Sequence, residues 1–220
     1  MQITLKIAER HGEIIQCQYL IASEYNRHYD IVFSTDISDL DAKIEPYPHY
    51  YLMGLIEGRL AACCGLYVDD TYVRKYGMIH ETDFHPHLRD AGVADEYPIW
   101  VLHEFTKLVV AQGWEGNGLG HFMLASAHNS TFLGAGDTRP WLLTCCAKLS
   151  IFERFYDVVG IRTRFLRPFP YYRVHEHYRS EEDPMSSRLI IPHLDIPRRW
   201  YDLEIPGTYE VERFGGRHDD

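Results

Sequence analysis

The clearest candidate for a binding site is a glycine-rich segment in the middle of the chain. Residues 113–120 contain four glycines, after a valine-containing stretch that ends at Val110 and before an apolar stretch with helical spacing. Glycine lets backbone amides approach a ligand closely and adopt positive φ, and the following helix points its unbonded N–H groups and positive dipole end back at the loop. This arrangement binds phosphate oxygens. We predict that the following backbone amides hold them: Gly116, Asn117, Gly118, Leu119 and Gly120.

Two other phosphate-binding motifs do not fit this segment. A P-loop needs Lys and Ser or Thr after its last glycine, and here His121 and Phe122 follow. A dinucleotide-binding fold places its glycine turn after the first strand, not beyond residue 110. A flexible turn before a helix would have the same glycine content, so this remains the competing interpretation.

Glu104 is the first candidate for acid–base chemistry, because it lies in an apolar stretch with the character of a strand. A carboxylate on a largely apolar face is expected to have a raised pKa and to accept a proton near neutral pH. The competing interpretation is a buried acid paired with a lysine or arginine. His103, on the opposite face of the strand, is the alternative base. By strand alternation, the expected neighbours of Glu104 on its own face are Trp100, Leu102, Thr106, Leu108 and Val110.

The elements that must position these residues alternate between strand and helix patterns. The spacing predicts a strand at the N-terminus, a helix over 12–28, a hairpin over 50–68 and a long strand over 99–110. After the glycine turn it predicts a helix to about residue 133, a strand over 140–146, a helix over 149–159 and strands over 161–166 and 187–191. This order predicts an α/β domain with a mixed sheet.

Composition and charge narrow the classes of partner. The chain has 220 residues, 45% of them hydrophobic, and a net charge of -10. This fits one globular domain and argues against nucleic acid, because phosphate backbones need clustered positive charge. No stretch is apolar for long enough to span a bilayer.

The five cysteines predict buried, reduced thiols in a cytoplasmic protein. Cys63-Cys64 and Cys145-Cys146 are adjacent pairs, and strand neighbours point to opposite faces, so they are poorly placed to bridge each other. A C-x-x-C spacing is absent, and the histidines of the polar segments are expected to be solvated, so we expect no metal. Those histidines are His80, His85, His87, His175 and His177.

Two segments in the same order resemble the signatures of GNAT acyltransferases. Glu115–Gly120 resembles the family's pyrophosphate loop, R/Q-x-x-G-x-G/A, and the strand before it resembles the family's central strand. The second signature, a strand and a helix ending L-Y-x-x-x-G-F, resembles 142–161, with Tyr156 and Gly160 at the matching positions. The resemblance covers about residues 50–165, and it implies a mixed, mostly antiparallel central sheet flanked by helices on both faces.

The resemblance also implies a function and roles for single residues. The donor would be acetyl-coenzyme A or another acyl-coenzyme A, and the acceptor the amine of a small molecule. Tyr156 would be the acid near the thioester sulfur, and the backbone near Val110 would receive the pantetheine arm. Glu115 stands where the family has a basic or amide residue. Because an acid beside a pyrophosphate is unfavourable, its side chain should turn away or the donor should be held differently.

A branch of this family offers an alternative. Glu104 with Lys107 resembles the E-x-x-R strand of acyl-homoserine-lactone synthases, and Glu153-Arg154 resembles the E-R helix of that branch. This resemblance implies an acyl carrier protein as donor partner and a homoserine-lactone or N-acyl amino acid product. A third interpretation is a non-catalytic sensor that retains an acyl-coenzyme A pocket.

The domain organisation follows from the same patterns. We expect a GNAT-like domain over residues 1–167 and an extension over 168–214 that packs on the same domain or on a partner in a homodimer. The tail over 215–220 is expected to be disordered.

Overall fold

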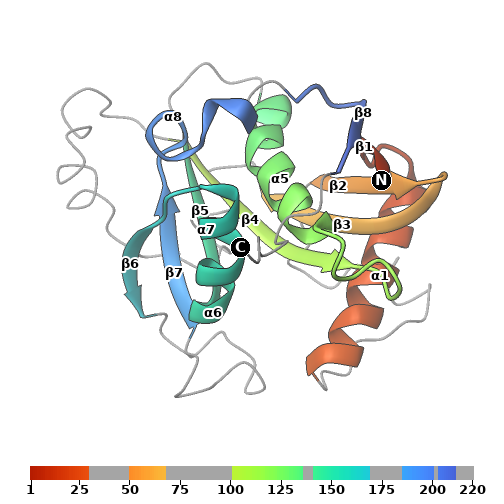
Figure 1. The fold of residues 1–220 in the computed structure, drawn as a ribbon, viewed down its shortest axis with the longest axis horizontal. Coiled ribbons are helices and arrows are strands. Elements are labelled where there is room, and N and C mark those ends of the chain that lie inside the picture. Colours follow the sequence, from red (N-terminus) through yellow and green to blue (C-terminus); the bar gives the residue numbers. More distant parts are fainter. Residues whose placement is uncertain (30–49, 68–100, 136–140, 169–184, 201–202, 212–220) are drawn as a thin grey trace, which may run out of the picture.

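The protein is described by a computed structural model over residues 1–29, 50–67, 101–135, 141–168, 185–200 and 203–211 (Figure 1). The strands are β1 (Gln2–Ile7), β2 (Tyr50–Ile56), β3 (Arg59–Tyr67), β4 (Val101–Val110), β5 (Trp141–Lys148), β6 (Arg164–Pro168), β7 (Met185–Ile190) and β8 (Gly207–Glu210). The helices are α1 (His11–Tyr29), α5 (Leu119–Ala135), α6 (Leu149–Ile151), η1 (Phe152–Tyr156), α7 (Asp157–Val159), α8 (Pro192–Asp195) and η4 (Arg198–Trp200).

The described strands form one sheet in the order β6-β7-β5-β4-β3-β2-β1-β8. Among the described strands, only β4 and β5 pair in parallel, and every other neighbouring pair is antiparallel. The mixed, mostly antiparallel sheet is therefore confirmed. The described parts of the chain after residue 168 add β7 and β8 to this same sheet.

Helices cover both faces of the sheet, as expected. Alternate residues of β2 and β3 belong to two separate apolar clusters: Leu52 and Cys64 pack with α5, whereas Tyr51 and Cys63 pack with α1. Because both faces are covered, the two strands are buried along nearly their whole length. Figure 1 shows α5 crossing one face, with α1 behind the sheet.

The predicted hairpin forms with a two-residue turn. Glu57 and Gly58 both have positive φ, 50° and 74°, which matches the twist that antiparallel strands require. The predicted core cysteines are buried and free in the described residues, namely Cys17, Cys63, Cys64 and Cys145. No helix in the described ranges combines the length and the apolar character needed to cross a bilayer.

The helix after β5 ends as its sequence predicts, but the next strand starts later than expected. Gly160 adopts a left-handed conformation after α7, and the Ile161 amide donates to the Tyr156 carbonyl at 3.0 Å. Ile161 therefore closes the helix, and β6 begins at Arg164 rather than at residue 161. Trp200 Nε1 and Arg199 Nη2 both donate to the Val159 carbonyl at 3.0 Å, so the C-terminal segment caps this helix.

Candidate functional site

The parallel ladder between β4 and β5 is short, and the two strands then separate. It joins Val101–Phe105 to Trp141–Cys145. Beyond these residues, the described ladder of β4 continues with β3 and that of β5 with β7. Figure 1 shows β4 turning toward α1 and α5 while β5 runs on beside β7. Among the described residues, β5 therefore pairs with β4 only up to Phe105, and the segment of β4 that ends at Val110 continues without it.

A β-bulge at Lys107 separates two halves of β4. Cys63 pairs with Val109 but Gly65 pairs with Thr106, so β4 carries one extra residue, and Lys107 has a φ of 54°. A bulge of this kind bends the strand and increases its twist. It also shifts the alternation of side chains between the two faces.

The bulge corrects the predicted surroundings of Glu104. Leu108 and Val110 were expected to share its face, but they pack against the cluster on the α5 side, together with Phe105. Val109 packs instead on the α1 side. Simple alternation therefore fails beyond Lys107, because the extra residue exchanges the faces.

Glu104 is buried, with 1% of its surface exposed, on the face that carries α1. The strand register gives this placement. Phe105, next to Glu104 in β4, pairs with Leu66, and both side chains belong to the cluster on the α5 side. Because successive side chains of a strand point to opposite faces, Glu104 lies on the α1 side. Burial lowers the pKa of half-buried Lys107, and the Glu104 carboxylate partly offsets this by raising it. The Glu104 carboxylate therefore lies within electrostatic reach of Lys107.

Tyr156 lies on the opposite face, in a buried cluster of polar and aromatic side chains. It sits in the π-helical turn η1, and its hydroxyl donates a hydrogen bond to the Cys145 thiol. Its ring lies 5.3 Å from that of His128 and 5.0 Å from that of Phe152, between centroids. Burial, followed by the proximity of Cys145, raises the pKa of Tyr156 well above its usual range, so the hydroxyl keeps its proton at neutral pH.

Cys145 lies between the two candidate groups but is not an activated nucleophile. Burial raises the pKa of its thiol to about 12, and the hydrogen bond from Tyr156 only partly offsets this. Glu104 raises the same pKa, which places its charge within electrostatic reach of the sulfur. The junction of β4 and β5 therefore brings the predicted base and acid to opposite sides of one point in the sheet.

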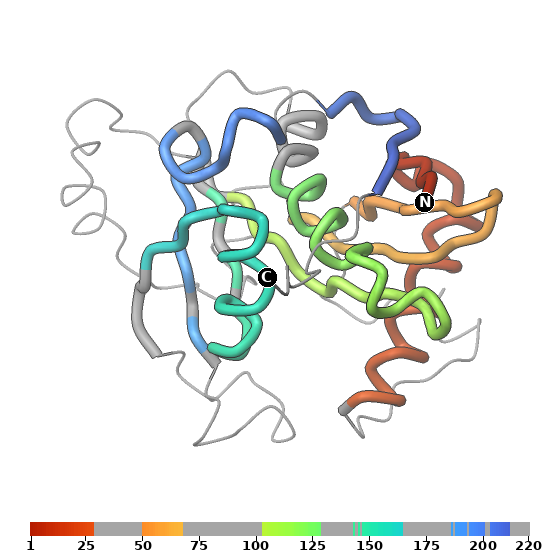
Figure 2. The backbone as a smooth tube through the Cα atoms, in the orientation of Figure 1, coloured from red at the N-terminus to blue at the C-terminus, as the bar shows by residue number. Residues whose placement is uncertain are grey.

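The glycine loop has the backbone conformation that its sequence predicts. Gly113, Gly116 and Gly118 have positive φ, 92°, 74° and 76°. A Cβ atom added at Gly113 or Gly116 would meet nothing within 4 Å, so these glycines serve the backbone conformation. Helix α5 begins at Leu119, and its first N–H groups therefore point into the loop. Figure 2 traces β4, the loop and α5 as one continuous path.

The start of α5 packs closely on the helical turn that holds Tyr156. A Cβ atom at Gly120 would lie 3.0 Å from Phe155 Cε1, which only glycine tolerates easily. The His121 ring stacks on that of Phe155 at 4.6 Å, and His121 Nε2 lies 2.9 Å from the Arg154 carbonyl oxygen. The loop amides and Tyr156 are thus held on the same side of the sheet.

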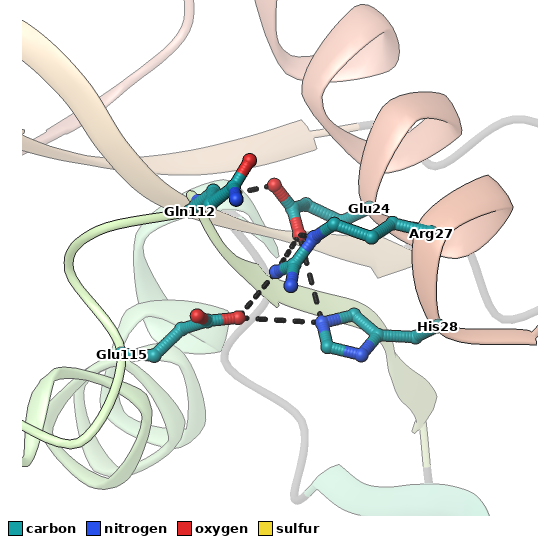
Figure 3. A network of polar contacts seen from close by, with 5 residues as sticks. All are labelled: Glu24, Arg27, His28, Gln112 and Glu115. Atoms are coloured by element: carbon teal, nitrogen blue, oxygen red, sulfur yellow. Dashed lines mark hydrogen bonds and ion pairs between the residues drawn. The ribbon is translucent and has the colours of Figure 1, made fainter.

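Glu115 turns away from the loop toward the last turns of α1 (Figure 3). Its carboxylate pairs with Arg27 and lies 3.3 Å from His28 Nε2. Buried Glu24 also binds Arg27, whose Nε donates at 2.9 Å, and accepts the backbone N–H of Gln112 at 3.1 Å. The hydrogen bond from Arg27 is the main cause that lowers the pKa of Glu115. The sequence left two possibilities for Glu115: its side chain turns away, or the donor is held differently. In the structure the side chain turns away from the loop and pairs with α1.

Three of these side chains are also close enough to bind a metal ion. The ligand atoms of Glu24, His28 and Glu115 lie within 4.8 Å of one another. Arg27, however, already bonds both carboxylates, so a divalent ion would have to displace it. The histidines around residues 80–87 and 175–177 lie outside the described residues.

Two parts of this site were not found in the sequence. The Glu24–Arg27–His28 group has the i, i+3 and i+4 spacing of a helical polar face, a signal that could have been read, but its partner Glu115 lies far along the chain. His128 is a polar residue inside an apolar helix, and it is fully buried. Its Nδ1 lies 2.7 Å from the Leu124 carbonyl oxygen, and burial lowers its pKa to about 4.

No protein-family model and no curated protein sequence matches the chain. Solved structures do resemble it. A CoA-dependent acyl-homoserine lactone synthase, BjaI, with SAM and isopentyl-CoA, has a TM-score of 0.56 and 16% identity, over 91% of this chain and 86% of that chain.

Two further solved structures extend the likeness. The acyl-homoserine lactone synthase LasI has a TM-score of 0.51 and 11% identity, over 86% of this chain and 89% of its own. A protein described as a phosphinothricin N-acetyltransferase has a TM-score of 0.50 and 14% identity, over 86% and 98%. The fold is thus the one shared by GNAT acyltransferases and acyl-homoserine lactone synthases, as the sequence resemblance implied.

The buried His128 should make stability fall in mild acid. Its pKa is about 4 in the folded protein against an ordinary 6.5, so below pH 6.5 the unfolded chain binds a proton that the folded chain does not. The free energy of unfolding is therefore unaffected by His128 above pH 6.5. Between pH 6.5 and pH 4 it falls, by about 3 kcal/mol in all. Urea unfolding of the wild type and His128→Phe at pH 7, 6 and 5 measures this difference.

The variant His128→Phe should lose less stability between pH 7 and pH 5 than the wild type. His11→Phe, at an exposed position at the start of α1, is the matched control and should follow the wild type. Parallel pH profiles for the wild type and His128→Phe would show that His128 does not control this part of the acid sensitivity.

Proposed function

We propose that this protein is an acyltransferase that moves an acyl group from acyl-coenzyme A to the amine of a small-molecule or amino-acid-like acceptor. The observation that carries the proposal is the position of the glycine loop directly after the strand that diverges from β5. Strand β4 and the glycine loop follow one another along one path (Figure 2), and the described ladder of β4 with β5 ends at Phe105. A strand followed directly by a glycine loop suits a long donor, with its thioester beside the strand and its pyrophosphate at the loop.

The donor would be held mainly by backbone groups. The amides from Gly116 to Gly120 would receive the pyrophosphate, helped by the dipole of α5. The edge of β4 near Val110 would bind the pantetheine arm by adding an extended segment to the strand. The thioester would then lie where β4 and β5 separate, close to Cys145 and Tyr156.

Acyl transfer to an amine needs proton removal from the amine, stabilisation of the oxyanion and protonation of the leaving thiolate. Glu104 would accept the proton of the amine, directly or through water. Tyr156, whose pKa is raised by burial, would remain protonated and give its proton to the thiolate. Because the two residues lie on opposite faces, the reacting atoms would sit in the gap between the strands.

The packing around Tyr156 supports a short acyl chain. On the α5 side, the rings of Phe105 and His128 lie 5.0 Å apart, and those of Phe152 and Tyr156 are equally close. These rings fill the interior near Cys145. A long acyl chain placed there would have to displace them.

The loop assignment predicts that Gly118→Glu abolishes binding of coenzyme A. A side chain and a negative charge would enter the phosphate site, and the φ of 76° would be strained. Coenzyme A at a hundred times its Kd should stabilise the wild type by about 2.7 kcal/mol, visible as a rise in Tm. Gly118→Glu should show no rise.

Gly58→Glu is the matched control for this experiment. Gly58 has nearly the same φ, 74°, and lies in the open β2–β3 turn, so charge and backbone strain are alike. It should retain the full shift. No shift for the wild type at millimolar coenzyme A would contradict the donor assignment.

The chemical roles predict that Glu104→Gln and Tyr156→Phe lower kcat while donor affinity stays nearly unchanged. Losses of about 100-fold are typical for general acid–base groups. Tyr51→Phe is the control, because Tyr51 is also buried, with 2% exposed, but packs on the α1 side. Full activity of both variants with a good acceptor would show that the protons move by another route.

A CoA-dependent acyl-homoserine lactone synthase is the second candidate function. The likeness to BjaI favours it, and that protein was solved with SAM and isopentyl-CoA. The glycine loop fits the same donor, since an acyl carrier protein presents no pyrophosphate. Under this candidate, SAM would be the acceptor in place of another amine. An acyl carrier protein as donor, and a sensor without catalysis, are the remaining alternatives.

An acyl-coenzyme A series from two to twelve carbons, with SAM or simple amines as acceptors, separates these functions. We expect the tightest binding at two or three carbons, because the rings near Cys145 leave little room. An affinity that rises past six carbons, by about 0.8 kcal/mol for each buried methylene, together with turnover of SAM would favour the synthase. Donor binding without turnover of any acceptor would favour the sensor.

A further inference from the structure

Glu115, the first residue of the Glu115–Gly120 segment, is an acid beside the proposed phosphate site. Glu115 precedes the amides that would bind pyrophosphate, and its uncompensated charge would oppose an anionic donor. In the structure it is not uncompensated, because Arg27 from α1 bonds its carboxylate. The basic group absent from the loop sequence is therefore supplied in space by a helix 88 residues earlier in the chain.

Arg27 is held in this position by a second carboxylate. Glu24, one turn earlier in α1, is buried, with 8% of its side chain exposed, and it accepts from Arg27 Nε at 2.9 Å and again from the Nη2 group. Because Nε and Nη2 both donate to the same oxygen, Oε2, this edge of the guanidinium faces Glu24. Its Nη2 group bonds Glu24 and Glu115 at the same time, so it links the helix to the loop (Figure 3).

The same Glu24 carboxylate also holds the loop backbone. Its Oε1 accepts the N–H of Gln112 at 3.1 Å, while its Oε2 takes the guanidinium. The entrance of the loop and the side chain of Glu115 are therefore both fixed to α1. Glycines at residues 113, 116 and 118 would otherwise let the segment take many conformations.

We propose that Arg27 is a positioning residue for the donor, which pairs with Glu115 and ties α1 to the glycine loop so that the loop amides are prepared to receive pyrophosphate. Arg27 acts here through Glu115 and does not itself bind the donor. The inference rests on the proposed donor site, and it adds α1 to the parts of the chain that control donor affinity.

The test is a double-mutant cycle on the Kd of coenzyme A, measured by isothermal titration calorimetry. Arg27→Gln should weaken binding about tenfold, because it leaves the Glu115 charge without its cationic partner. Glu115→Gln should bind at least as tightly as the wild type, because it removes the negative charge while its amide oxygen can still accept from Arg27. The double variant Arg27→Gln/Glu115→Gln should return to within about threefold of the wild type.

Two controls distinguish positioning of the donor from general support of the fold. Arg10→Gln removes the same charge at the exposed other end of α1 and should leave the Kd unchanged. Pantetheine lacks the pyrophosphate, and its binding, followed by NMR at millimolar concentration, should not differ between Arg27→Gln and the wild type.

Each outcome bears on the inference. A wild type that binds coenzyme A and an Arg27→Gln variant that binds it equally well would overturn the positioning role and leave the proposed function intact. Failure of the double variant to recover would overturn compensation of the Glu115 charge as the role of Arg27, and equal loss for pantetheine would assign Arg27 to the fold. No binding by the wild type would remove the donor site and this inference together.

Discussion

The separation of β4 from β5 is the constraint on which the candidate site depends. If the two parallel strands stayed paired to their ends, the backbone groups on their facing edges would be hydrogen-bonded to each other and could not bind a ligand. Here the ladder ends at Phe105 and Cys145, and the bulge at Lys107 bends β4 away. Every other feature of the site is arranged around this fork, because the loop and α5 continue the path of β4 whereas η1 follows β5.

A loop rich in glycine can adopt the required conformation but cannot hold it alone. The structure fixes the loop from two sides. At its entrance, Glu24 accepts the Gln112 amide and Arg27 holds Glu115; at its exit, Gly120 and His121 pack on η1. The loop therefore gains its order from contacts with elements on both faces of the sheet, and it connects the two helical layers.

Local features of the fold were predictable, whereas features that depend on distant contacts were not. The hairpin turn at Glu57-Gly58 and the positive φ values in the glycine loop follow from residue type, and both were found. The bulge at Lys107 was missed, because nothing in the residue pattern marks an extra residue opposite β3. The partner of Glu115 was missed because Arg27 reaches it only through the packing of α1. The later start of β6 was missed although its cause is local, since the amide of Ile161 is bonded to the Tyr156 carbonyl at the end of the helix.

The two faces of the fork differ in what they can contribute to the proposed reaction. On the α5 side, burial and the contacts of Tyr156 keep that hydroxyl and the Cys145 thiol protonated at neutral pH. The proposed acid would therefore be in its protonated form before the thiolate leaves. On the α1 side, Glu104 is buried and lies within electrostatic reach of Lys107. Donor and acceptor would therefore approach the fork from opposite faces of the sheet, and the strand edge between them would be the place where they meet.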